Sequence, residues 1–148
     1  MDKEFIRVRS TKDITISAVT VIAGIILAVV PASTPLNIVG YCALFTGLIL
    51  VLAVKTGYKD KETGVKYCKT EHFFAQSLRQ SICDAICSKP DSVDLSEEDK
   101  GNGIRLDIYH SKASGKAYIQ IFEYIPYKYE PCSKLYEHDL DKINKLIR

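Results

Sequence analysis

Charged side chains are absent from one long part of this sequence. From Ile14 to Val54 there is no Asp, Glu, Lys, Arg or His, and only Pro31-Ala-Ser-Thr-Pro35 interrupts the apolar run. A soluble amphipathic helix carries polar residues on its water-facing side, so this absence excludes an ordinary surface helix. As helices, the runs 14–30 and 36–54 would extend about 25 and 28 Å, close to the ~30 Å hydrocarbon core of a bilayer. The sequence therefore predicts a transmembrane helical hairpin.

Two other interpretations of the apolar run stay open. The first is a hairpin buried inside a soluble protein, but a chain of 148 residues leaves too little polypeptide to cover two wholly apolar helices. The second is a cleaved signal peptide from Met1 to about Ala32, whose apolar region would be unusually long and whose cleavage site would contain the unfavourable Pro31. The membrane hairpin is the interpretation that we carry forward.

Basic residues flank the apolar run on both sides, and the connecting loop contains none. Those before it are Lys3, Arg7, Arg9 and Lys12, and those after it are Lys55, Lys59, Lys61, Lys66 and Lys69. Basic flanks stay on the cytoplasmic side of a membrane. We therefore expect a multi-pass protein of the cell (inner) membrane with cytoplasmic N- and C-termini.

Small residues recur three or four positions apart in both predicted spans. They are Thr20, Gly24 and Ala28 in the first span, and Gly40, Ala43 and Gly47 in the second. Such spacing places small side chains on one helix face, where two backbones can approach closely. The face serves either packing within the hairpin or self-association into an oligomer, and the sequence does not separate the two.

Catalytic motifs are also missing. The chain has no glycine-rich phosphate loop, no HExxH, no nucleophile elbow and no kinase-type loop. The three histidines, His72, His110 and His138, have carboxylates or hydroxyls beside them in sequence, but adjacent residues on a strand or helix do not face one another. We expect neither an enzyme nor a bound cofactor.

The balance of charge excludes a further class. Basic and acidic residues are nearly equal in number after residue 54. A nucleic-acid-binding domain usually has a marked basic surplus on one face. We expect the partners to be membrane lipid and either another protein or a second copy of the chain, and no nucleic acid.

The number of cysteines is odd, which does not suit a set of disulfides. The five are Cys42, Cys68, Cys83, Cys87 and Cys132. In a cytoplasmic domain they are expected to be free thiols. Cys83 and Cys87 lie at i and i+4 and could share a metal with Cys68, Cys132, His72 or His138, but no zinc-ribbon spacing supports this, and small buried side chains are the favoured interpretation.

The residues after the hairpin predict a small α+β domain. We expect a β-hairpin around Asp60 to Gly64, then a helix from Thr70 to Lys89 with Phe74, Leu78, Ile82 and Ile86 on its apolar face. An acidic loop follows, then strands at 104–110 and 116–125, an irregular stretch between Pro126 and Pro131, and a last helix from Tyr136. The domains are thus a leader (1–13), the hairpin (14–54) and a cytoplasmic α+β domain (55–148) with an antiparallel sheet and two helices.

Two tyrosines in the irregular stretch are candidates for a partner contact. Tyr127 and Tyr129 lie between prolines, and exposed tyrosine provides contact area at low entropic cost. Together these features favour a membrane-anchored interaction or regulatory module that holds a small domain at the cytoplasmic membrane face. The alternative is a membrane-active effector, pore-forming or holin-like, whose hairpin oligomerises under control of the cytoplasmic domain.

Overall fold

The chain forms two compact units. In this computed structural model, residues 3–30, 33–99, 101 and 103–147 are described. One unit combines Met1–Ile6 with Lys59–Arg148, and the other is Arg7–Tyr58. Pro31 and Ala32, which interrupt the apolar run in the sequence, lie outside the described residues.

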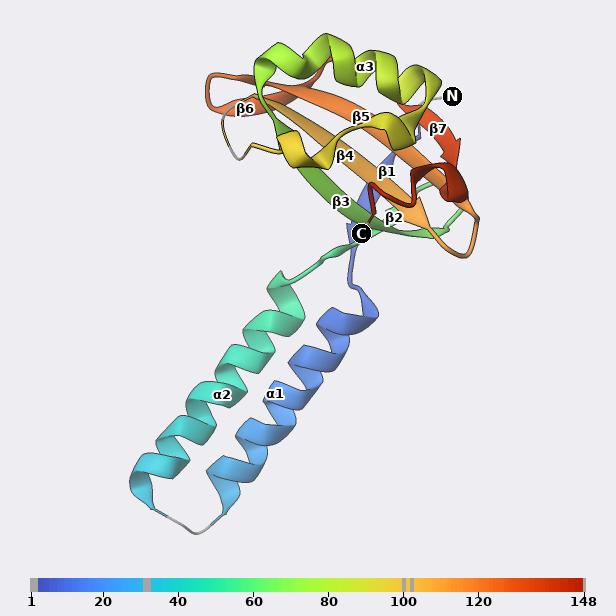
Figure 1. The fold of residues 1–148 in the computed structure, drawn as a ribbon. Coiled ribbons are helices and arrows are strands. Elements are labelled where there is room, and N and C mark those ends of the chain that lie inside the picture. Colours follow the sequence, from blue (N-terminus) through green and yellow to red (C-terminus); the bar gives the residue numbers. More distant parts are fainter. Residues whose placement is uncertain (1–2, 31–32, 100, 102, 148) are drawn as a thin grey trace. The chain divides into compact units, whose positions relative to one another are not determined.

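The unit 7–58 contains two long helices, α1 (Thr11–Val29) and α2 (Thr34–Ala53), which run antiparallel to each other (Figure 1). Ser10 caps α1 in a capping box with Asp13, and Pro35 occupies the first turn of α2, where its missing N–H costs nothing. Both helices are long and apolar enough to cross a membrane, and only 17% and 11% of their most apolar windows are buried. The helices agree with the predicted spans to within a few residues.

The other unit is built on an antiparallel sheet. Its strands are β1 (Phe5–Val8), β2 (Gly57–Asp60), β3 (Lys66–Phe74), β4 (Ile104–Ser111), β5 (Lys116–Ile125), β6 (Lys128–Pro131) and β7 (Tyr136–Asp139). The order is β1-β2-β3-β4-β5-β6, and β7 pairs with the part of β5 that β6 leaves free. The strands predicted at 104–110 and 116–125 are confirmed, and the hairpin turn predicted at Asp60–Gly64 joins β2 to β3.

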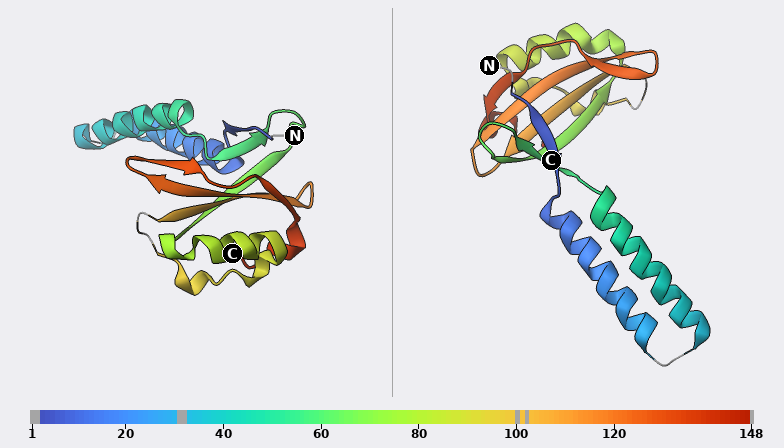
Figure 2. Two further views of the ribbon diagram at one scale, coloured as in Figure 1. Left: turned by 90° about the horizontal axis from the view of Figure 1, so that it is seen from above. Right: turned by 180° about the vertical axis from the view of Figure 1, so that it is seen from behind.

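The core lies between one face of this sheet and α3 (Arg79–Ser88), which covers that face as both views of the domain show (Figures 1 and 2). The register aligns Leu106 with Ile121 and Ile108 with Ile119, so their side chains form one continuous apolar layer. Ile82 and Ile86 of α3 pack on this layer. Alternation along β4 and β5 thus places the core, as the sequence predicts.

The helix predicted from Thr70 to Lys89 is half wrong. Residues up to Phe74 belong to β3, a 3₁₀ helix covers Gln76–Leu78, and only Arg79–Ser88 is α-helical. The apolar spacing of four misled the prediction, because four is a multiple of the strand period of two as well as close to the helical period. Phe74 therefore reaches the same core as Ile82, but from the sheet.

The predicted C-terminal helix and the predicted irregular stretch are both wrong. Tyr136–Asp139 forms β7, and a 3₁₀ helix at Leu140–Ile143 follows it. Lys128–Pro131 forms β6, which pairs with the end of β5. Pro131 is tolerated because β6 ends there, where no ladder N–H is required. Further 3₁₀ helices lie at Pro90–Ser92 and Leu95–Glu97 in the predicted acidic loop.

The leader also differs from the expectation. Residues 1–13 were expected to form a leader separate from the α+β domain, but Phe5–Val8 forms strand β1 of the same sheet. The sheet domain is therefore discontinuous in sequence, with the two apolar helices inserted between its first and second strands.

Candidate functional site

The small-residue faces predicted for the two apolar segments lie between α1 and α2. A Cβ atom added to Gly24 would come within 2.5 Å of the Leu44 backbone nitrogen, and one added to Gly40 within 2.4 Å of that of Ala28. Such distances are far shorter than van der Waals contact, so only glycine permits this approach. A Cβ atom added to Gly47 would likewise come within 2.9 Å of the Val21 backbone nitrogen. Thr20, Ala28 and Ala43 are half-buried. Within the described structure, the face is used for packing α1 against α2.

Hydrogen bonds close the base of the hairpin. The Asp13 carboxylate accepts the Thr56 N–H at 2.8 Å, the Thr56 hydroxyl at 2.7 Å and the Ser10 N–H at 2.8 Å. Asp13 is buried, with 7% of its surface exposed. The residue that caps the start of α1 therefore also holds the chain that leaves α2. We call Ser10, Asp13 and Thr56 the hairpin clasp.

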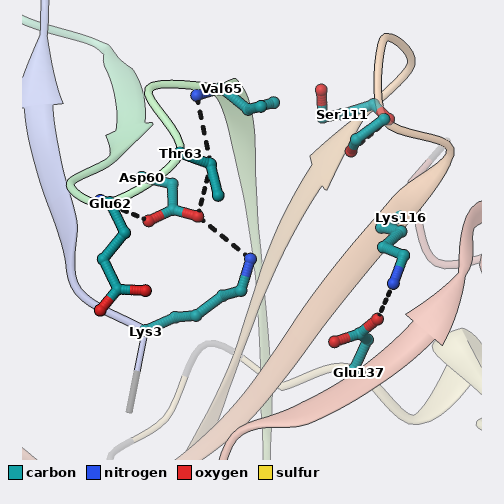
Figure 3. A network of polar contacts seen from close by, with 9 residues as sticks. Lys3, Asp60, Glu62, Thr63, Val65, Ser111, Lys116 and Glu137 are labelled. Carbon is teal, nitrogen blue, oxygen red and sulfur yellow. Dashed lines mark hydrogen bonds and ion pairs between the residues drawn. The ribbon is translucent and has the colours of Figure 1, made fainter. Parts of the chain in front are cut away.

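The N-terminal segment is tied to the rest of the sheet domain by an ion pair. Lys3 donates to Asp60 at 3.0 Å, and the same carboxylate accepts from the Thr63 hydroxyl at 2.7 Å and the Glu62 N–H at 3.0 Å (Figure 3). These contacts, the Thr63 hydroxyl first and then Lys3, outweigh burial and lower the pKa of Asp60 from 3.8 to about 2. Burial opposes the charge on Lys3, but its bonds to Tyr118 and Asp60 raise its pKa overall.

An aromatic cluster surrounds the same segment on the sheet face opposite α3. The Phe5 ring stacks on Tyr109 at 4.3 Å between centroids and meets the edge of Tyr67 at 5.3 Å. Lys3 lies over the Tyr118 ring at 4.4 Å. Each aromatic pair contributes about 0.5–1.5 kcal/mol beyond the area that it buries. Local sequence patterns do not reveal this cluster, because its members are spread from residue 5 to residue 118.

Next to the aromatic cluster, the middle of this face holds a buried ion network. Asp107 is 1% exposed and lies 2.7 Å from Lys69 Nζ and 2.8 Å from Arg105 Nε. Burial raises the pKa of Asp107 despite these cations. Burial opposes the charge on Lys69, but Asp107 and then Glu71 raise its pKa. The charges neutralise one another, so the network has the character of a structural support.

The three histidines occupy different environments. His72 binds Glu98 at 3.2 Å and the Leu146 backbone oxygen at 2.7 Å, which fastens the C-terminal segment to the core. His110 and His138 lie on either side of Ala117 in the sheet register. Burial lowers the pKa of both His110 and His138. Among the described residues, no hydrogen bond joins either of them to a carboxylate.

The cysteines are free thiols in the structure. Cys83 and Cys132 both pack against the core, and burial raises the pKa of Cys83. Cys87 is exposed on α3 and hydrogen-bonds to Tyr136, which raises the pKa of that phenol to about 12. Across the part of the chain that is described, no three His, Cys, Asp or Glu side chains are grouped as metal ligands would be.

The two candidate contact tyrosines have different environments. Tyr127 is 97% exposed and has a positive φ of 74°. Tyr129 is half-buried, with Arg105 4.7 Å from its centroid and with Tyr124 and Phe73 against its edges. Of the two rings only that of Tyr127 is almost fully exposed, and the partner contact stays a prediction.

The chain matches no protein-family model, no curated protein and no solved structure.

Proposed function

We propose that this protein is a membrane-anchored interaction or regulatory module of the cell (inner) membrane, with both termini in the cytoplasm. The hairpin α1–α2 spans the bilayer, and the sheet domain is held at the cytoplasmic face. Large apolar side chains along both helices are exposed, among them Ile16, Val19, Phe45, Ile49 and Leu52, and lipid is the solvent that suits them.

One observation supports placing both flanks of the hairpin on the same side of the membrane. Residues from before and after the hairpin form a single domain. Lys3 binds Asp60, and Phe5 packs on Tyr67, Tyr109 and Tyr118. The two flanks of the hairpin must then lie on the same side of the bilayer, which requires an even number of spans. The basic flanks favour the cytoplasmic side.

The same observation weighs against a cleaved signal peptide. Removing residues 1–32 would take Lys3 and Phe5 from the domain. Asp60 would then lose its cation, and Tyr67, Tyr109 and Tyr118 would lose the Phe5 ring that packs on them. These lost contacts mean that the folded domain favours a chain that keeps its N-terminus.

The membrane-active alternative has less support. A pore needs a polar lining, but the hydroxyls of Thr15, Thr20 and Thr46 are bonded back to carbonyls of their own helices. The glycines that would bring protomers together are used between α1 and α2. Outward surfaces that are apolar and bulky suit contact with lipid better than a water-filled channel.

The topology is tested by labelling single cysteines in intact cells. In a protein whose five cysteines are replaced by serine, a cysteine at position 33 should react with a membrane-impermeant maleimide added outside. A cysteine at position 4 and one at position 114 should react only after the cells are permeabilised. Labelling at position 4 or 114 in intact cells, or none at position 33 under any condition, would refute the proposal.

The interaction role has its own test. Full-length protein solubilised from membranes of its native host should co-purify with a partner in fixed ratio, whereas a version ending at residue 58 should not retain it. A partner held equally by both would place the contact in the hairpin and contradict a role for the sheet domain.

A further inference from the structure

The turn between β5 and β6 is the most exposed apolar feature of the sheet domain. Ile125, Pro126 and Tyr127 are all exposed, Tyr127 almost completely at 97% and Ile125 at 39%. We call Tyr124–Tyr129 the β5–β6 tip. It reads Tyr-Ile-Pro-Tyr-Lys-Tyr and contains three tyrosines.

Tyr127 occupies a backbone conformation that tyrosine rarely adopts. Its φ of 74° follows Pro126, which is the arrangement of a type II turn, where glycine is the usual residue. The left-handed conformation costs a residue with a side chain about 1–2 kcal/mol. The ring makes no packing contact that would offset this cost, because nearly all of it is exposed. A strained position with a free aromatic ring is typical of a contact residue.

The charged residues around the β5–β6 tip indicate which kind of surface it would bind. Lys128 is the only charged residue between Tyr124 and Tyr129. The carboxylates on either side are engaged: Glu123 binds Arg79 at 3.0 Å, and Glu130 forms an ion pair with Lys128 itself. The tip therefore presents aromatic and aliphatic groups, one ion pair whose charges offset each other, and no free carboxylate. This is the composition of protein segments at the headgroup level of a bilayer, where Tyr is favoured and a lysine keeps its charged end in water.

The linkers between the sheet domain and the apolar helices are short. This explains how a contact made by so few residues can hold the domain on the membrane. Strand β1 ends at Val8 and β2 begins at Gly57, while α1 begins at Thr11 and α2 ends at Ala53. The intervening segments extend at most about 15 Å. One Tyr and one Ile would not hold a free protein on a membrane, but a domain confined at the surface has a high effective concentration of lipid.

We propose that the β5–β6 tip inserts Tyr127 and Ile125 into the lipid headgroup region of the membrane that the hairpin spans. The proposal rests on the membrane anchoring proposed above and deepens it. It gives the domain a second point of attachment, so that its orientation at the bilayer is fixed and its other surfaces face the cytoplasm for partner binding.

The test uses the absence of tryptophan from the chain. Tyr127→Trp introduces one fluorophore at the tip of the full-length protein, which is placed in nanodiscs of phosphatidylcholine and phosphatidylglycerol with or without bromine near the top of the acyl chains. We expect emission at shorter wavelength and about twofold quenching by bromine, since interfacial groups lie about 5–10 Å into this boundary.

Two matched variants make the outcomes distinguishable. Ala113→Trp places the fluorophore at an exposed site in the turn between β4 and β5, at the other end of β5, and should be unquenched. Phe45→Trp places it on the exposed surface of α2 and should be strongly quenched if the hairpin is inserted.

Quenching at position 45 with none at position 127 would overturn the tip proposal and leave the proposed function standing. No quenching at position 45 would overturn both. Equal quenching at 113 and 127 would indicate a domain without fixed orientation and would also refute the tip proposal. If position 127 were shielded only after membrane proteins of the native host were added, the tip would bind protein and the lipid assignment would be wrong.

Discussion

Lys3 and Asp60 form an ion pair of 3.0 Å across 57 positions of sequence, with both apolar helices of the chain between them. The pair closes a long loop whose middle is the hairpin. Closing a loop of this length costs conformational entropy, which the aromatic cluster around Phe5 and the buried ion pair must offset. The domain is therefore complete only when residues from both flanks of the hairpin come together.

The contribution of the N-terminal segment can be measured directly. Phe5→Ala should lower the free energy of unfolding of the sheet domain by about 2–3 kcal/mol, because it removes a half-buried ring and its stacking on Tyr109. Ile6→Ala, at a neighbouring exposed side chain, should cost less than about 1 kcal/mol. Urea titration of the full-length protein in detergent, followed by tyrosine fluorescence, gives both values. Equal effects of the two substitutions would mean that β1 does not support the domain.

Acid should weaken the Lys3–Asp60 pair. The pKa of Asp60 falls from 3.8 to about 2 on folding, so its stabilising contribution is fully present above pH 3.8 and is lost as the pH falls through about 2. The raised pKa of Lys3 keeps that side chain charged throughout this range. Asp60→Asn should cost about 1–3 kcal/mol at pH 7 and should flatten the pH dependence between pH 4 and about 2. Urea titrations at several pH values measure this. A variant as pH-sensitive as the native chain would assign the acid effect to other carboxylates.

Composition and alternation made the hairpin and the central strands predictable. The hairpin follows from the missing charges between Ile14 and Val54, and β4 and β5 follow from alternation that each strand carries within itself. The glycine faces were also visible, although their spacing alone did not say which helix they meet. A helix or strand can be predicted from the local sequence pattern when its own residues specify it.

Features that depend on distant residues were not predictable. Phe5–Val8 is too short to be recognised as a strand, and it becomes one by pairing with residues beyond the hairpin. Tyr136–Asp139 has helical spacing of apolar residues with those that follow, yet it pairs with β5 because an edge is free there. In both segments, pairing with a distant strand determines the secondary structure and overrides the preference of the local sequence. The strain at Tyr127 is likewise a property of the turn geometry and has no sequence signal beyond the preceding proline.

The glycines of the hairpin should not tolerate a side chain. Gly24→Ala would bring its Cβ within 2.5 Å of the Leu44 backbone, so the helices must separate, and we expect a loss of about 1–3 kcal/mol. Ile25→Ala, at the adjacent exposed position, should have little effect. Thermal unfolding in detergent compares them. If Gly24→Ala instead altered only the oligomeric state, the glycine face would lie between protomers, as the membrane-active alternative requires.

The hairpin clasp should behave as one energetic unit. Asp13→Asn and Thr56→Val each break bonds between the start of α1 and the segment after α2, and the double variant should cost less than the sum of the two. We expect a coupling energy of about 1–2 kcal/mol, typical of hydrogen bonds to a charged group. A double-mutant cycle in nanodiscs, measured by thermal unfolding, gives this energy. Additive costs would show that Asp13 serves only to cap α1.

Relief of the strain at Tyr127 should make the domain more stable. Tyr127→Gly places the residue favoured at a φ of 74°, which removes about 1–2 kcal/mol of strain, while the greater freedom of glycine in the unfolded chain returns about 0.5–1 kcal/mol. A net gain of about 0.5–1 kcal/mol is expected in urea titrations of the full-length protein in detergent, where no bilayer is present. Gly115, which already has a φ of 66°, provides the reverse control, because Gly115→Ala should be destabilising. A loss of stability in Tyr127→Gly would show that the ring supports the fold, and its exposure would then have a structural cause.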